Sequence, residues 1–214
     1  MKYLKIIIFL SLHSFSFGQI ISKQKRDSVE KGRLKLVTTF LNLKPEDKIA
    51  DIGTGSGYKL VQISNECPSC TFDVEDIDSL TSNKTILTKW IYKAGNLTKI
   101  ENFKYYYGDD TTTNMPSNSY NKVLIFNVIH EFTYKKKMLD EIKRILKKDG
   151  QVFIEEILVH KKIKKNSKCN YPFLLELDFK KIMEDNNFLL KREITKFDAG
   201  INRYIKVFEY VVAL

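Results

Sequence analysis

Three glycines at alternate positions mark a loop that could cradle a ligand. Residues 48–52 read as a short buried strand, and Gly53, Gly55 and Gly57 follow it directly, ahead of a segment with helical periodicity. Without Cβ atoms the backbone there can bend sharply and come close to a bound molecule. A dinucleotide loop has the spacing G-x-G-x-x-G, and here the third glycine falls one residue early. The spacing therefore disfavours a dinucleotide.

Acidic residues stand beside this loop and at the ends of the next two predicted strands. Asp51 lies two residues before the first glycine, where it suits a cationic amino group better than a pyrophosphate. Asp76 follows about 20 residues on, where a carboxylate can accept hydrogen bonds from both ribose hydroxyls. Asp109 ends the third strand and could accept a bond from an adenine amino group. These residue types point to a nucleoside ligand that carries a cationic group.

Alternating strand and helix patterns must bring these residues together. Strands are predicted at residues 48–52, 71–76, 103–107, 122–128, 151–155, 188–197 and 201–212. Helices are predicted at residues 29–41, 58–65, 79–94, 134–147 and 173–186. The alternation predicts a parallel sheet with helices on both faces, and the last two strands predict an antiparallel hairpin at one edge. The fold class is therefore α/β, with a doubly wound, mostly parallel sheet of seven strands.

Five ordered motifs resemble those of the class I S-adenosylmethionine-dependent methyltransferases. They are Asp51–Gly57, Glu75–Asp78, Tyr107–Asp110, the pair Asn118–Val123 and Phe126–Glu131, and Ile145–Gln151. The departures from the family pattern, at Asn121 and at Lys148 with Asp149, lie away from the expected cofactor contacts. The resemblance implies a Rossmann-like fold over residues 34–212 and S-adenosylmethionine as cofactor. It does not specify the substrate.

The same resemblance implies a role for each residue of the predicted cofactor site. The three glycines would line the methionine part of the cofactor, and Asp51 would lie near its amino group. Asp76 would hold the ribose, while Ile77 would pack against the adenine and Asp109 would face its amino group. Asn127, at the end of the fourth strand, would close the site.

The chemistry implied is a methyl transfer that depends mainly on alignment. A sulfonium methyl is already activated, so the protein has to place the acceptor in line with the carbon–sulfur bond. His130 and Glu131 are the candidates for a base, which is needed only if the acceptor must lose a proton. His130 could instead be a packed wall residue, and Glu131 a carboxylate that complements a helix dipole. Neither Asn-Pro-Pro-Tyr nor Asp-Pro-Pro-Tyr stands at the fourth strand, which argues against methylation of an adenine amino group in nucleic acid. We expect a small-molecule acceptor rather than a nucleic acid.

Composition sets wider limits on partners. The chain has 214 residues, enough for one domain with a short extension, and a formal net charge of +10. Arginine accounts for only five of the 36 cationic residues. Because bidentate phosphate recognition favours arginine, the charge favours a solvated surface over an anionic partner.

Cys67 and Cys70 form a C-x-x-C pair ahead of the second strand. A zinc site would need four ligands, and a redox pair would need a helix amino terminus to activate one thiol. A local disulfide and two plain thiols are the other interpretations, and no metal site is expected.

The first residues have the layout of a secretory signal peptide. Lys2 and Lys5 precede an apolar run, and small residues at Ser16 and Gly18 suit a cut before Gln19. The run of about 12 residues is too short to span a membrane. We expect a signal peptide at residues 1–18, a polar segment at 19–33 and the domain at 34–214, in a periplasmic or secreted protein of bacterial type. The alternatives are a cytoplasmic protein that retains the segment and, for function, an exported binding protein without enzymatic activity on a methyltransferase-like fold.

Overall fold

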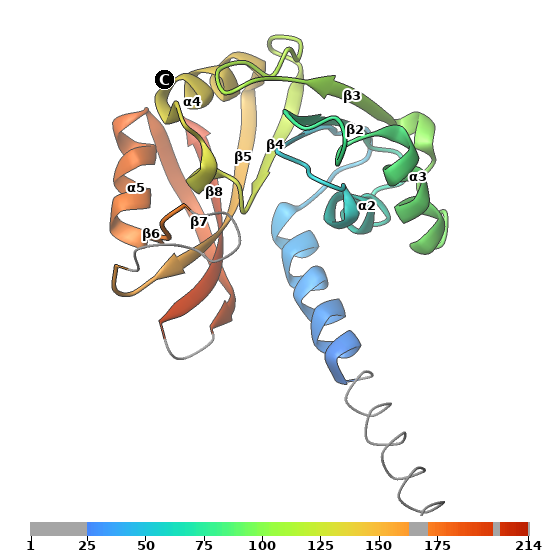
Figure 1. The fold of residues 1–214 in the computed structure, drawn as a ribbon, viewed down its shortest axis with the longest axis horizontal. Coiled ribbons are helices and arrows are strands. Elements are labelled where there is room, and N and C mark those ends of the chain that lie inside the picture. The colour runs from blue at the N-terminus through green and yellow to red at the C-terminus, as the bar shows by residue number, and fades with distance from the viewer. Residues whose placement is uncertain (1–24, 163–170, 199–201, 214) are drawn as a thin grey trace, which may run out of the picture.

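The computed structural model of the chain describes residues 25–162, 171–198 and 202–213. The predicted signal peptide, residues 1–18, lies outside these ranges. One mixed sheet runs through the molecule in the strand order β3-β2-β1-β4-β5-β8-β7, and a short strand, β6, pairs with β5 (Figure 1).

The first five strands are parallel to one another. They are β1 (Lys48–Ile52), β2 (Thr71–Asp76), β3 (Phe103–Tyr107), β4 (Tyr120–Phe126) and β5 (Leu146–Val159). The hairpin of β7 (Phe188–Asp198) and β8 (Arg203–Val212) is antiparallel and joins the sheet through β5. The predicted mostly parallel sheet with a carboxyl-terminal hairpin is confirmed, and the structure adds the two-residue β6 (Leu174–Leu175) to the seven predicted strands.

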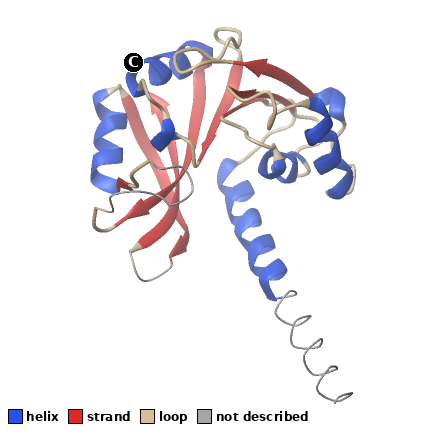
Figure 2. Cartoon of the chain, in the orientation of Figure 1, coloured by secondary structure: helices blue, strands red, loops and turns tan. Residues whose placement is uncertain are grey.

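Helices cover both faces of the sheet (Figure 2). They are α2 (Tyr58–Ser64), α3 (Lys84–Lys93), α4 (Lys135–Ile145), α5 (Glu176–Asp185) and a helix over residues 25–41, with 3-10 turns at η1 (Ile100–Asn102) and η2 (Ile129–Glu131). Leu124 of β4 packs in the core shared with the 25–41 helix, α2 and α3, whereas its neighbours Val123 and Ile125 pack against α4 and α5. This strand is therefore buried on both faces, as its continuous apolar pattern predicts.

Chain order reverses beside β1, and this reversal locates the ligand crevice. The chain adds β2 and β3 on one side of β1 and then places β4 on the other side. In open α/β sheets, ligands bind beyond the carboxyl ends of the strands at such a switch point. The glycine loop after β1 and Asn127 after β4 both lie there.

Three predicted boundaries are wrong for local reasons. The helix expected at 79–94 begins at Lys84, because the Asn83 side chain caps it by accepting a 3.1 Å bond from Ile86 N. The helix expected at 173–186 begins at Glu176, after β6. The turn expected at Lys148–Gly150 is a bulge within β5, where the register with β4 shifts between Tyr120 and Lys122.

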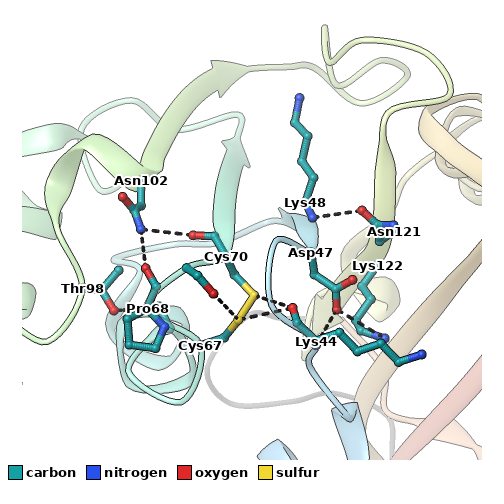
Figure 3. Close-up of a disulfide and its surroundings, with 12 residues drawn as sticks. Lys44, Asp47, Lys48, Cys67, Pro68, Cys70, Thr98, Asn102, Asn121 and Lys122 are labelled. Carbon is teal, nitrogen blue, oxygen red and sulfur yellow. Dashed lines mark hydrogen bonds and ion pairs between the residues drawn. A yellow bond between two sulfur atoms is a disulfide. The ribbon is translucent and has the colours of Figure 1, made fainter.

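Cys67 and Cys70 form a disulfide in the turn between α2 and β2 (Figure 3). Both residues are buried, and both sulfur atoms lie within 3.4 Å of the Lys44 carbonyl oxygen. Asn102 Nδ2 donates to the carbonyl oxygens of Pro68 and Cys70, at 2.8 and 3.1 Å. The disulfide turn is thus tied to the approach to β3.

Candidate functional site

A cavity of about 340 Å³ lies at the switch point. Most of the predicted site residues line it: Gly53, Gly55, Asp76, Ile77, Asp109, Asn127 and Glu131. Asp51, Gly57 and His130 are not part of its lining. The fold therefore gathers residues spread over 79 positions of sequence around one hollow at the ends of β1 to β4.

The glycine loop needs glycine for two reasons, left-handed backbone and close approach. Gly53 and Gly57 have φ angles of 66° and 72°. A Cβ on Gly53 would lie 2.6 Å from Val128 Cγ2, and one on Gly57 would lie 2.2 Å from Leu87 Cδ1. Gly53 thus lets the loop close against the end of β4, whereas Gly57 lets α2 begin against α3. The predicted cofactor contact of Gly57 stays a prediction.

Asp76 organises the mouth of the cavity. Its Oδ2 accepts a 2.7 Å bond from Gly55 N, and its Oδ1 accepts a 2.9 Å bond from Asp78 N. A carboxylate has about four lone-pair sites, so each oxygen can accept a further bond from a ribose hydroxyl. Ile77, beside it, is 65% exposed and offers an uncovered apolar surface to a planar ring.

Asp109 is held as an ionised acceptor at the end of β3. The Thr111 hydroxyl and the Thr111 and Thr112 amides donate to its Oδ1 at 2.7 to 2.9 Å. These bonds hold the pKa of Asp109 below its ordinary value. The second oxygen can accept a bond from an amino group.

Asn127 presents an amide oxygen that a ligand could use. It has a positive φ of 58°, which asparagine tolerates better than most residues. Its backbone N donates to the Glu155 carbonyl at 2.7 Å, and its Nδ2 donates to Glu155 Oε1 at 3.0 Å. Its Oδ1 is buried and has no hydrogen-bond partner in the described part of the chain. Because such an acceptor is costly to leave unpaired, a ligand donor here would be stabilised.

Two buried carboxyl groups lie beneath the glycine loop. Asp51 Oδ2 accepts a 2.6 Å bond from the Thr54 hydroxyl, and burial raises the pKa of Asp51 to about 7. Glu75 Oε2 accepts a long bond of 3.4 Å from Gly53 N, and burial raises the pKa of Glu75 to about 8. Its Oε1 is buried against Gly108, whose backbone N–H opposes part of this rise in pKa. A cationic ligand would stabilise the ionised form of both groups.

Glu75 also lines the cavity, although the sequence motifs predict no role for it. Its position in the sequence could have indicated one, because it is an acidic residue in a mostly buried strand and is only 2% exposed. A buried acid next to a glycine loop is uncommon enough to mark a site.

Of the two acid–base candidates, Glu131 lines the cavity and His130 does not. His130 is 6% exposed, and its Nδ1 lies 3.0 and 3.1 Å from the two carboxylate oxygens of Glu156. His130 is therefore packed beside the cavity lining, with its Nε2 3.5 Å from Glu131 Oε1, and its role as a base stays a prediction.

Neither a metal-binding group of side chains nor a membrane-spanning helix is found among the described residues. There, no group of three His, Cys, Asp or Glu side chains is placed to hold a metal ion. Of the helices in the same ranges, none is both long and apolar enough to cross a bilayer.

Residues 50–154 match a family model described as a methyltransferase domain. The ribosomal RNA small subunit methyltransferase C of Buchnera aphidicola is 27% identical over 164 residues, which cover 71% of this chain and 43% of that protein. The chain thus spans less than half the length of this curated relative.

Solved structures share the fold at low identity. A SAM-dependent methyltransferase from Aquifex aeolicus superposes with a TM-score of 0.64 at 19% identity, over 83% of this chain and 89% of that one. The geranyl diphosphate C-methyltransferase of Streptomyces coelicolor gives 0.68 at 10% identity, over 86% and 79%. The phosphoethanolamine N-methyltransferase 2 of Haemonchus contortus gives 0.66 at 15% identity, over 86% and 53%.

Proposed function

We propose that the chain is a class I S-adenosylmethionine-dependent methyltransferase and that it transfers the methyl group of S-adenosylmethionine to a small-molecule acceptor. The observation that carries this proposal is that Gly53, Gly55, Asp76, Asp109 and Asn127 line one cavity. It offers a carboxylate for a ribose, a second for an adenine amino group and an unpaired amide oxygen. Bound cofactor would supply an activated methyl group on a positively charged sulfur.

The residues present fit such a cofactor. Glu75 of β2 and Asn127, which follows β4, both line the cavity, and the buried Oδ1 of Asn127 has no hydrogen-bond partner among the described residues. Gly53 keeps the loop close to the sheet, because any side chain would collide with Val128. Asp51 and Glu75 together favour a ligand with positive charge near the loop.

The protein's part in the reaction is alignment. The acceptor's lone pair forms the new bond to the methyl carbon, and the carbon–sulfur bonding pair passes to sulfur, which becomes neutral. An acceptor that carries a proton must also release it, and Glu131, which lines this cavity, is the candidate base. Holding two reactants in line supplies most of the acceleration expected of such a site.

A small-molecule acceptor is supported by the residues at the end of β4. There the chain reads Asn127-Val128-Ile129-His130, without the Pro-Pro pair expected for methylation of a base amino group. Two of the similar structures are named for small substrates, geranyl diphosphate and phosphoethanolamine. The relative named for ribosomal RNA is 27% identical over the shared part.

We further propose that the protein works outside the cytoplasm. The signal-peptide pattern at residues 1–18 and the disulfide between Cys67 and Cys70 support this location, since disulfides persist in oxidising compartments. The same observations favour a second candidate function, an exported binding protein without catalysis. A similar structure is named a [4+2]-cyclase, so this fold also occurs in a protein named for another reaction.

Calorimetry with S-adenosylmethionine tests the proposal. Asp76→Asn keeps the shape and removes the charge, so affinity should fall by about tenfold or more through loss of charge-assisted bonds. Asp149→Asn, on the exposed bulge of β5, is the matched control and should leave affinity unchanged. Absence of any binding heat with the intact protein would overturn the proposal. Binding without transfer of a labelled methyl group to any fraction of a cell extract would favour the binding protein.

A further inference from the structure

A second cavity has a volume of about 630 Å³. It lies between the 25–41 helix, α2 and the sheet, and its lining includes Arg33, Tyr58, Lys59, Asn127, Glu155 and Lys196. Asn127 lines both cavities. A molecule in the second cavity could therefore contact the same asparagine as a molecule in the first.

The floor of the second cavity is a buried ionic cluster centred on Glu155. Glu155 Oε2 lies 2.6 Å from Lys59 Nζ and 2.9 Å from Lys196 Nζ. Its Oε1 accepts the bond from Asn127 Nδ2. Glu155 is 2% exposed, so both ammonium groups are drawn toward the interior rather than into bulk water.

This cluster has more positive than negative charge. Although burial opposes ionisation, Lys59 and Lys196 hold the pKa of Glu155 below its ordinary value, so it is ionised. Burial lowers the pKa of Lys59 to about 8, which leaves it mostly protonated at neutral pH. Two cations then face one anion. Asp51 also acts on Lys59, but with a pKa of about 7 it carries only part of a charge.

The charged residues at the rim of the cavity do not offset the excess positive charge of the cluster. Asp27 and Glu30 stand beside Lys31 and Arg33, and Arg33 Nη1 pairs with Glu30 at 2.6 Å. The rim charges therefore cancel, while the floor keeps its excess cation. A buried charge without compensation is costly, so an anion that enters the cavity is stabilised.

We propose that the second cavity holds the methyl acceptor, and that this acceptor carries a carboxylate or phosphate bound by Lys59 and Lys196. The assignment as acceptor rests on the proposed function. The assignment as an anion site rests only on the ionic cluster. The carboxylate of the cofactor's own methionine part is the other source of such a group, and the experiment separates the two.

The first arm uses the wild-type chain alone, saturated with S-adenosylhomocysteine. Benzoate and phenyl phosphate are titrated against benzamide, which has the shape of benzoate without its charge, and binding is followed by ligand-observed NMR. At least one anion should bind about tenfold more tightly than benzamide, because a charge-assisted pair is lost in the amide. Equal binding of benzamide, or binding of neither anion, would overturn the proposal.

The second arm tests the residues. Lys59→Met and Lys196→Met each keep an unbranched side chain, shorter by the nitrogen alone, and remove its charge, and Lys89→Met, exposed on α3, is the matched control. Each of the first two should weaken anion binding about tenfold and leave the affinity for S-adenosylhomocysteine within twofold, whereas the control changes neither. Anion binding that survives in both variants would overturn the assignment.

The outcomes also separate this proposal from the proposed function. If the two variants lose cofactor affinity instead, the lysines bind the cofactor's carboxylate and the acceptor assignment is wrong. If the wild type binds the anions but no cofactor, the anion site stands and the methyltransferase proposal fails. Thermal unfolding of each variant shows whether it is folded, and the wild-type arm decides the outcome if one is not.

Discussion

Asp51 and Glu75 are the residues whose protonation a cationic ligand would change most. Both lie under the glycine loop, and burial raises their pKa values to about 7 and about 8. Near neutral pH both are partly protonated in the free protein. A sulfonium or ammonium group beside them favours the ionised form and so lowers both pKa values.

Cofactor binding should therefore release protons, and affinity should increase as the pH rises from 6 to 8. Above pH 9 both groups are already ionised in the free protein, so release should vanish. Calorimetry at pH 7 in phosphate and in Tris measures the release, because the apparent enthalpies differ by the protons exchanged with the buffer. Glu75→Gln removes one titrating group and should reduce the release.

S-adenosylhomocysteine supplies the charge control, since its sulfur is neutral. It should release fewer protons than S-adenosylmethionine at the same pH. Identical apparent enthalpies in the two buffers, with both ligands, would contradict the assignment of raised pKa values to this site.

At the scale of elements, periodicity predicts the sheet because its signal is local. The continuous apolar run in β4 and the alternation of helices and strands require only neighbouring residues. Periodicity does not predict the start of α3, because a single capping bond from Ile86 N to the Asn83 side chain decides it. The two-residue β6 has no periodic signal at all.

Some residues of the candidate site could likewise be predicted from local sequence, whereas others could not. Residues in motifs next to strand ends, such as Asp76 and Asp109, could be found because each motif is contiguous. The cluster of Lys59, Glu155 and Lys196 could not, because its members come from α2, β5 and β7. Nothing in the sequence links positions that only the folded sheet brings together.

The disulfide turn between α2 and β2 permits a prediction about stability. Its ring encloses only four residues, from Cys67 to Cys70, so the loss of chain entropy that it imposes on the unfolded state is small. Replacing both cysteines by alanine should cost about 2 kcal/mol in the free energy of unfolding on the chain-entropy estimate. Urea unfolding of the variant and of the oxidised wild type measures the difference.

Reduction provides the control for that measurement. Dithiothreitol added during unfolding should lower the stability of the wild type toward that of the double variant and leave the variant unchanged. Equal stability of the wild type and the double variant without dithiothreitol would contradict the pairing. So would a wild-type mass that corresponds to three free thiols, rather than one, after purification from an oxidising compartment.

At the scale of the whole molecule, the two cavities differ in charge and meet at one residue. The first is lined by carboxylates that include Asp76, Asp109 and Glu131, whereas the second has the excess cation of Lys59 and Lys196. A cationic ligand is thereby favoured on one side of Asn127 and an anionic one on the other. This difference in charge also disfavours the binding of either ligand in the cavity of the other.

The two ends of the 25–41 helix have different surroundings, so the helix contributes both to the core and to the second cavity. Val37 and Leu41 are buried in the core, whereas residues 25–32 are exposed and the lining of the second cavity includes Asp27, Glu30 and Arg33.

Removing residues 1–33 should therefore keep the core and the first cavity and open one wall of the second. Affinity for S-adenosylhomocysteine should stay within about twofold, while benzoate or phenyl phosphate should bind about tenfold more weakly through renewed access of water to the cluster. Calorimetry measures the first and ligand-observed NMR the second, and circular dichroism checks the fold. Loss of cofactor binding in a truncated chain that is still folded would show that the helix serves the first cavity instead.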